Sequence, residues 1–359
     1  MAWSIPVLNR KKKLDQIVAV DLGARVTKAV HLQRTGDKYT LLGHALLDAP
    51  ISDKGTLPIE LLGEHLRAAA QAVNARTKTM VLAIGAADCL VRHVEMPEMP
   101  MDAVRLVLKN NSRNYLQQDL PNHVFDCHVI YKAVPVTLPN PAKKGPVSHV
   151  QRLLVAGAKR QFLDELLSTG KTAGLNLTHV IPGLICPANA FELTLPEVFK
   201  EETCALIEIG FKCSAVFILQ QGELVLARVV NIGADRLTAA IADELKISYA
   251  EAEGIKVGMP EEVRSIIEVF MAPLARELRA SIDYFEHQQD KPVARVYLSG
   301  GSTRSELIMQ ILQSELMSAC VTWNPVAALQ LELPPAQKAE IDQVGPQLGV
   351  AIGAAVAVL

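Results

Sequence analysis

Aromatic residues are scarce in this sequence: they make up 4% of its 359 residues, although half of the chain is hydrophobic. A core built from this composition is aliphatic, and the hydrophobic content argues against disorder over most of the length. A chain of this length exceeds what one hydrophobic core usually serves. We therefore expect an ordered protein with two or more subdomains.

An excess of charge of one sign is also absent, since 36 Lys and Arg residues face 38 Asp and Glu residues, for a net charge of −2. This balance argues against a general nucleic-acid-binding protein, so no nucleic-acid partner is expected. The six cysteines are scattered and contain no Cys-x-x-Cys pair. Their spacing favours reduced, buried thiols in a cytosolic protein over a zinc site or a disulfide framework.

Long hydrophobic runs are missing as well. The longest, residues 348–359, is shorter than the roughly 20 residues that a membrane span needs, and it predicts a buried helix. At the start of the chain, apolar residues precede the basic run 10–13, the reverse of the order in a secretion signal. We expect residues 1–13 to be a solvated basic tail, with a weak contact between Trp3, the lysines and an anionic membrane surface as the alternative.

One pattern occurs twice in the chain. Residues 17–28 read IVAVDLGARVTK and residues 205–214 read ALIEIGFKCS: an apolar run, a carboxylate, one apolar residue, a glycine and a short polar turn. Each copy continues into further β-like runs separated by turn residues. The expected strands lie within 16–47 in the first copy and at 204–209, 214–220 and 224–231 in the second. This repetition predicts two halves of related fold that face each other.

The first copy has the residues of a phosphate-binding turn. An apolar strand ending in Asp-x-Gly places Asp21 at the carboxyl end of the strand, where ligands bind in α/β sheets. Gly23 allows close approach of the backbone to a phosphate, and Lys28 would neutralise a phosphate oxygen. Asp21 would hold a hydrated Mg²⁺ ion. A single Asp-x-Gly turn is better explained as an ordinary hairpin.

The second copy changes that interpretation. Glu208 and Gly210 occupy the corresponding places, and Ser214 supplies a hydroxyl group beside them. Two such turns facing each other predict a clamp for a phosphate chain, with Mg²⁺ held through water by Asp21 and Glu208.

Two further motifs suit the remainder of a nucleotide. A buried strand at 294–298 runs into Gly300, Gly301 and Ser302, and a helix is expected to start near Thr303, so that its N–H groups approach a base or a sugar. A simple strand–helix turn is the alternative. Glu253 and Lys256 lie three apart on a predicted helix face, either within reach of a ribose or as a surface ion pair.

Together these motifs resemble the actin-like ATPase superfamily. Within it, the chain resembles the PilM family of type IV pilus assembly proteins and, more distantly, the FtsA cell-division proteins, over nearly its whole length. The stretches that carry this resemblance are 20–28, 97–100, 231–238, 248–253, 324–325 and 348–353. The implied fold is α/β, with duplicated actin-like (ribonuclease H-like) domains and an inserted subdomain of the FtsA/PilM type.

The resemblance also implies a division of the chain. The first half comprises residues 14–78 and 172–202, interrupted by an insertion at 79–171. The second half spans 203–330, with a small helical subdomain at about 259–289, and 331–359 pack back on the first half. Residues 263–285 keep a helical spacing in which Pro273 is expected to produce a kink or a break.

The function implied by the resemblance is that of a cytoplasmic scaffold that binds ATP and Mg²⁺. Its insertion would help form a groove for the N-terminal peptide of a PilN-like inner-membrane protein, which would hold it at that membrane. Self-association into rings or short filaments is a further expectation. Alternatives are an FtsA-like cytoskeletal protein, a small-molecule kinase, which would need a general base over an acceptor hydroxyl, and a scaffold without nucleotide.

Two positions depart from the family pattern. Glu208 stands where the family usually has Asp, which lengthens the side chain by one methylene, and Arg25 stands where small hydroxyl residues are usual. Both departures favour nucleotide binding with weak or absent hydrolysis.

Overall fold

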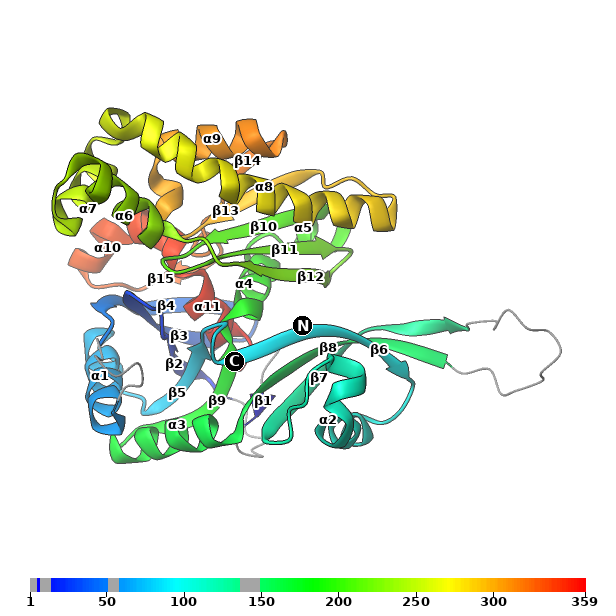
Figure 1. Ribbon diagram of the computed structural model, residues 1–359. Coiled ribbons are helices and arrows are strands. Elements are labelled where there is room, and N and C mark those ends of the chain that lie inside the picture. The colour runs from blue at the N-terminus through cyan, green and yellow to red at the C-terminus, as the bar shows by residue number, and fades with distance from the viewer. Residues whose placement is uncertain (1–4, 7–13, 51–57, 136–148) are drawn as a thin grey trace.

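The computed structural model describes residues 5–6, 14–50, 58–135 and 149–359. Most of the expected basic tail, including Trp3 and the run 10–13, lies outside the described residues. The chain forms two α/β halves, each built on its own sheet, with a third, smaller sheet beside them (Figure 1). No helix in the described ranges has the length and hydrophobicity needed to cross a membrane.

The first sheet has seven strands in the order β1-β9-β5-β2-β3-β4-β15. At its centre β2, β3 and β4 form an antiparallel meander, and β5 and β9 continue the sheet in parallel on the other side of β2. Its strands are β1 (Ile5–Pro6), β2 (Gln16–Asp21), β3 (Val26–Thr35), β4 (Lys38–Asp48), β5 (Thr79–Ile84), β9 (Asn176–Pro182) and β15 (Gln330–Leu331).

The second sheet repeats this arrangement in the order β12-β11-β10-β13-β14. Strands β12, β11 and β10 again form an antiparallel meander, and β13 and β14 again continue the sheet in parallel on the other side of β10. The strands are β10 (Thr203–Ile209), β11 (Ser214–Gln220), β12 (Glu223–Val230), β13 (Arg295–Ser299) and β14 (Cys320–Thr322). The duplication predicted from the repeated pattern is therefore confirmed, with β2 corresponding to β10 and β5 to β13.

Helices cover both faces of the first sheet, which is why β2 is a nearly continuous apolar run. On one face pack α1 (Ile59–Ala72) and α3 (Arg160–Thr172), against alternate residues of β2 and β5. On the other face lie α4 (Cys186–Thr194) and α11 (Gly349–Val356), in a core that they share with residues of the second sheet.

The apolar run 348–359 forms the buried helix that the sequence predicts. In α11 every residue from Gly349 to Ala355 is buried. A Cβ atom at Gly353 would overlap the carbonyl of Cys186 in α4, so glycine is what lets these two helices approach so closely. This pair lies between the two sheets and joins the two halves (Figure 1).

The second half has its helices on the outer side of its sheet. Its helices are α6 (Ala234–Leu245), α7 (Tyr249–Gly258), η2 (Pro260–Val263), α8 (Arg264–Gln289) and α9 (Glu306–Leu316). The side chains of α8 that face inward share one core with β10 and β11. The expectation of a separate helical subdomain at 259–289 is therefore wrong, because α8 is a layer of the second half itself.

Of the kink or break expected at Pro273, the break does not occur. Helix α8 continues through this residue for 26 residues in all. Val269, whose carbonyl loses its helical partner at Pro273, is 76% exposed, so water can replace the missing bond. On the opposite face, Met271 and Leu274 are buried, and this packing holds the helix on the sheet.

The insertion forms its own three-stranded sheet, β6-β8-β7, and its own small core beneath one helix. It consists of β6 (Cys89–Pro97), α2 (Met101–Leu116), β7 (His123–Pro135) and β8 (His149–Lys159). Strand β5 belongs to the first sheet, and α3 packs on α1 and β9. The insertion therefore spans 89–159, less than the predicted 79–171. The remaining short elements are η1 (Gly183–Ile185), α5 (Pro196–Glu201), η3 (Gly301–Arg304), α10 (Pro335–Val344) and η4 (Gly345–Gln347).

Candidate functional site

The first candidate turn follows β2, whose last residue is Asp21. The Leu22 N–H donates to the carbonyl of Ala83 in the neighbouring strand β5, and the Gly23 N–H donates to the Asp21 carbonyl at 2.9 Å. A Cβ atom at Gly23 would overlap the carbonyl oxygen of Val26. Glycine is thus what allows the chain to turn sharply at the carboxyl end of this strand.

Lys28 lies directly opposite Asp21 in the antiparallel pairing of β2 and β3. Its Nζ atom is 3.0 Å from Asp21 Oδ2, and both side chains are at most 20% exposed. Burial lowers the pKa of Lys28, but the charges of Asp21 and Glu208 outweigh this effect, and the pKa is raised overall. The ammonium group therefore stays charged between two carboxylates that come from different halves of the molecule.

The second candidate turn follows Glu208 in β10. The Gly210 N–H donates to the carbonyl of Cys213 at 3.1 Å, and a Cβ atom at Gly210 would lie 2.7 Å from the same oxygen. The cross-strand neighbour of Glu208 is Ala215, which carries no charge. Burial and the charge of Asp21 raise the pKa of Glu208 to about 7, against the opposing effect of Lys28. The structure thus brings Asp21, Lys28 and Glu208 together.

Ser214 links the second turn to the segment that precedes α6. Its hydroxyl donates to the carbonyl of Ile232 at 2.7 Å, and the residue is 1% exposed. The Ala234 and Asp235 N–H groups, at the start of α6, donate to the carbonyls of Gly210 and Phe211. The hydroxyl predicted to face a phosphate thus fixes the segment before α6 under the second turn.

Glu253 and Lys256 of α7 form a network with Thr238 of α6. Glu253 Oε2 accepts from Thr238 Oγ1 and from Lys256 Nζ, each at 2.6 Å. Lys256 is 9% exposed, so the alternative of an ordinary surface ion pair is wrong. Burial raises the pKa of Glu253, but the bonds from Lys256 and Thr238 and the charge of Arg25 bring it below its usual range.

Arg25 connects the first turn with the second half. Its NH1 atom is 3.2 Å from Glu253 Oε1, and its guanidinium lies 5.3 Å from the centre of the Phe211 ring in the second turn. Sequence reasoning singled out Arg25 as a departure from the family but did not place it in the site. A charged residue within a predicted phosphate turn was the signal that pointed to it.

The third predicted element, at Gly300, has the backbone that only glycine adopts readily. Its φ angle is +102°, and a Cβ atom would lie 2.5 Å from the carbonyl oxygen of Ile209. The Gly300 N–H donates to Pro346, which packs this turn onto η4. The turn therefore lies beside the end of β10, next to the second candidate turn.

The helix predicted to start near Thr303 is α9, which follows the single turn η3. The Thr303 hydroxyl donates to the Gly300 carbonyl and closes the single turn η3, which includes Gly301 and Ser302. Helix α9 begins only at Glu306, with Ser305 as its N-cap. The free N–H groups of α9 therefore do not lie at the Gly300–Gly301 turn.

Two carboxylates are available here to a divalent cation. No group of three or more His, Cys, Asp or Glu side chains suited to a metal occurs in the described ranges. A Mg²⁺ ion at Asp21 and Glu208 would therefore complete its coordination with phosphate and water oxygens, as this ion commonly does. Burial and the charge of Asp21 raise the pKa of Glu208 to about 7, and a cation bound beside it would stabilise the ionised form.

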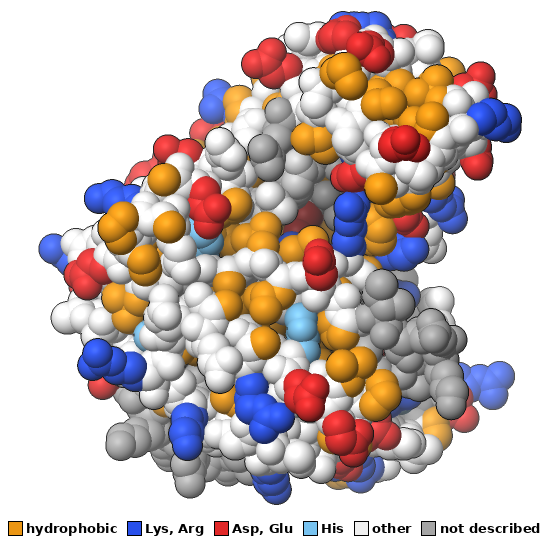
Figure 2. Space-filling view, turned by 90° about the vertical axis from the view of Figure 1, so that its left-hand side faces the viewer, with side chains coloured by type: hydrophobic (Ala, Val, Ile, Leu, Met, Phe, Trp, Pro, Cys, Tyr) orange, Lys and Arg blue, Asp and Glu red, His pale blue; other side chains and the backbone are white. Residues whose placement is uncertain are grey.

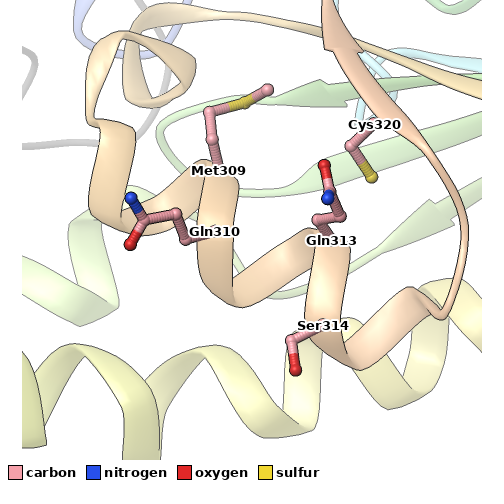
Figure 3. Close-up of a pocket in the computed structure, with 5 residues that line it drawn as sticks. All are labelled: Met309, Gln310, Gln313, Ser314 and Cys320. Atoms are coloured by element: carbon pink, nitrogen blue, oxygen red, sulfur yellow. The ribbon is translucent and has the colours of Figure 1, made fainter.

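The surface has two hollows that border the second half. Viewed from the side of α7 and α1, the molecule is notched between its two lobes, with side chains of both charges in the notch (Figure 2). A separate hollow of about 450 Å³ lies between α9 and β14 and is lined by Met309, Gln310, Gln313, Ser314 and Cys320 (Figure 3). No residue of the candidate site lines this second hollow.

Comparison with known proteins gives consistent results. The family model described as type IV pilus assembly protein PilM matches residues 19–358. A solved PilM-PilN type IV pilus biogenesis complex superposes with a TM-score of 0.80 at 18% identity, covering 97% of this chain and 100% of that one. The ethanolamine utilization protein EutJ from Carboxydothermus hydrogenoformans gives 0.53 at 14% identity, over 98% and 92%.

A curated relative, the cell division protein FtsA of Bacillus subtilis (strain 168), is 31% identical over 107 residues. That match spans 30% of this chain and 23% of FtsA. The structural likenesses confirm the predicted duplicated, actin-like fold.

Proposed function

This chain belongs to the family of type IV pilus assembly proteins PilM, and from that premise we propose that it is a nucleotide-binding scaffold of a pilus assembly platform. We propose that it acts on the cytoplasmic side of the inner membrane and is held there by a PilN-like partner. The observation that carries the nucleotide part is the meeting of Asp21, Lys28 and Glu208 between two glycine turns of equivalent strands.

We propose that the phosphates of ATP enter between these turns, where Lys28 would provide a positive charge and the two carboxylates would hold Mg²⁺. When bound, Mg-ATP supplies the cation that neutralises both carboxylates. The protein's own residues then orient the phosphates through Lys28 and the glycine turns. Glu208 is one methylene longer than the Asp that the family usually has at this position, which changes how it would hold a metal ion or a water molecule, so we propose that hydrolysis is slow.

The insertion contacts both halves, so its position depends on the angle between them. It is joined to the first half by the chain itself, and it contacts edge strand β12 of the second half. His93 Nε2 donates to the carbonyl of Leu224 at 3.0 Å, and Arg152 NH2 donates to the carbonyl of Val225 at 3.2 Å. A change in the angle between the halves would therefore shift or release the insertion.

We propose that the insertion, 89–159, helps to hold the N-terminal peptide of a PilN-like membrane protein. The support is the family assignment and the likeness to a structure solved as a PilM-PilN complex. Because the insertion touches the second half through His93 and Arg152, nucleotide between the halves would alter the affinity for this peptide, and peptide would alter the affinity for nucleotide by the same factor.

Isothermal titration calorimetry tests both parts. The purified protein is titrated with Mg-ATP, and then with a synthetic peptide of the N-terminal residues of a PilN-like membrane protein, with and without Mg-ATP. We expect nucleotide binding and a peptide affinity that depends on it. Absence of heat at millimolar ATP would remove the nucleotide part, and equal peptide affinities would remove the coupling.

The local similarity to FtsA favours one second candidate, self-association into rings or short filaments. ATP-dependent pelleting followed by electron microscopy would reveal such assemblies. If the protein stays in the supernatant at concentrations well above its dissociation constant for the peptide, this candidate is ruled out.

A further inference from the structure

Arg25 spans the two halves from within the first phosphate turn. It lies between Gly23 and Lys28 in the chain, yet its guanidinium contacts Glu253 in α7 and the ring of Phe211 in the second turn. Its side chain is 39% exposed. One positively charged side chain of the first turn therefore reaches across to the part of the second half from which contacts to a ribose were predicted.

The present contacts of Arg25 hold it only weakly. A partly exposed ion pair at 3.2 Å is screened by water, and the cation–π contact is to a ring that is itself only partly buried. Glu253 does not depend on Arg25, because Lys256 and Thr238 contact its other oxygen at 2.6 Å. Glu253 thus stays paired if Arg25 moves away.

Most of the guanidinium remains available. It carries five N–H donors, and among the described residues it makes one ionic contact, from NH1 to Glu253 Oε1. In the described part of the chain no further hydrogen bond of this group is present. A planar guanidinium with unused donors suits the paired oxygens of a phosphate, to which it binds more strongly than to a solvated carboxylate.

We propose that Arg25 is a phosphate-binding residue of the nucleotide site, which rests on Glu253 and Phe211 and turns onto a phosphate group when a nucleoside triphosphate binds. The exchange leaves Glu253 Oε1 free to accept a hydrogen bond from a ribose hydroxyl. Phosphate binding and ribose binding would thereby be linked through one side chain. This inference rests on the proposed nucleotide function and adds to it a residue that reports on the phosphate chain.

The test compares ligands that differ in their phosphates. ATP, adenosine and inorganic tripolyphosphate are each titrated calorimetrically into the wild type, Arg25→Ala and Arg25→Lys. We expect Arg25→Ala to bind ATP and tripolyphosphate about tenfold more weakly, with adenosine unchanged, because the lost contact is a charge-assisted hydrogen bond to phosphate. Arg25→Lys keeps the charge and loses the planar fork, so its affinity for ATP and tripolyphosphate should lie between those of the wild type and Arg25→Ala.

Arg264→Ala is the matched control. It removes a guanidinium that is 44% exposed and paired with Glu261 at 2.7 Å, at the start of α8 and outside both glycine turns. The nucleotide affinity should therefore stay at the wild-type value. Thermal unfolding of each variant checks that the fold is intact.

The outcomes separate the two claims. If the wild type binds ATP and Arg25→Ala binds it equally or more tightly, or loses adenosine to the same extent, the role of Arg25 is overturned. If the wild type binds tripolyphosphate through Arg25 but does not bind ATP, the phosphate role stands and the nucleotide function fails. A wild type that binds neither overturns both.

Discussion

The two carboxylate–glycine turns share a backbone plan and differ in their charges. Asp21 ends β2 and faces Lys28 across the strand pair, whereas Glu208 lies in β10 and faces Ala215. The first half thus carries its own counter-charge, and the second half relies on Lys28 of the first. The comparison shows that the duplicated sheet has been kept while the chemistry of its two turns has become unequal and interdependent.

Removing Lys28 should break this dependence with the largest effect. In Lys28→Met, Asp21 and Glu208 face each other without a cation, and removing one partner of a mostly buried pair costs about 2–4 kcal/mol of unfolding free energy. Urea denaturation at pH 7 measures it. Lys212→Ala, whose side chain is 63% exposed, should cost no more than about 1 kcal/mol. Equal losses in both variants would contradict the shared role of Lys28.

The glycines of the two turns should rank next. Gly23→Ala places a Cβ atom onto the Val26 carbonyl, and Gly210→Ala places one 2.7 Å from the Cys213 carbonyl. We expect both variants to lose about 1–3 kcal/mol, with the larger loss at Gly23 because its contact is closer. Thermal unfolding gives the order. The reverse order would show that the second turn is the more rigid of the two.

The pH dependence of stability should reveal Glu208. Its pKa is raised to about 7 in the folded protein, so the folded state binds more protons than the unfolded state between the unfolded pKa of about 4.5 and about 7. The contribution of Glu208 to the free energy of unfolding therefore falls as the pH rises through that window. Glu208→Gln should be more stable than the wild type at pH 8, by up to about 3 kcal/mol, and should lose this advantage below pH 4.5.

Denaturation curves of both proteins from pH 4 to pH 8 supply the measurement. A stability difference that is constant across this range would place the Glu208 carboxyl in a solvated environment. Asp21→Asn serves as the companion variant, since removing the charge of Asp21 should bring the pKa of Glu208 down and flatten the wild-type slope.

The smallest effect on stability is expected where the insertion meets the second half. A variant with His93→Ala and Arg152→Ala loses two hydrogen bonds to β12, for about 1–3 kcal/mol in all. Its peptide affinity should no longer depend on ATP. Arg228→Ala, on the same strand but paired with Glu277 of α8, is the control and should keep the dependence. Calorimetry with peptide distinguishes them.

Strand positions and the duplication could be predicted because they follow from local patterns. Apolar runs that end in a carboxylate and a glycine placed β2 and β10, and the turn residues after them placed the meanders. The limits of the insertion could not be predicted in this way. Strand β5 looks alike whether it joins the first sheet or a separate one, because its pairing with β2 and β9 joins segments far apart in sequence.

The candidate site shows the same division. Asp21, Lys28 and Glu208 were chosen from spacing and come together in the structure. Ser214 was chosen on the same grounds, yet its hydroxyl is bonded to Ile232. Side-chain spacing predicts which residues lie on a turn but does not say which neighbour competes for a hydroxyl group.

The sequence by itself determined the two related halves, their carboxylate–glycine turns and the buried last helix, because strand periodicity, glycine turns and hydrophobicity act over a few residues. Tertiary structure alone decided that Lys28 serves both carboxylates, that Arg25 reaches Glu253 and Phe211, and that the insertion contacts β12. These contacts depend on how the halves pack around α4 and α11, and no local pattern encodes that distance or orientation.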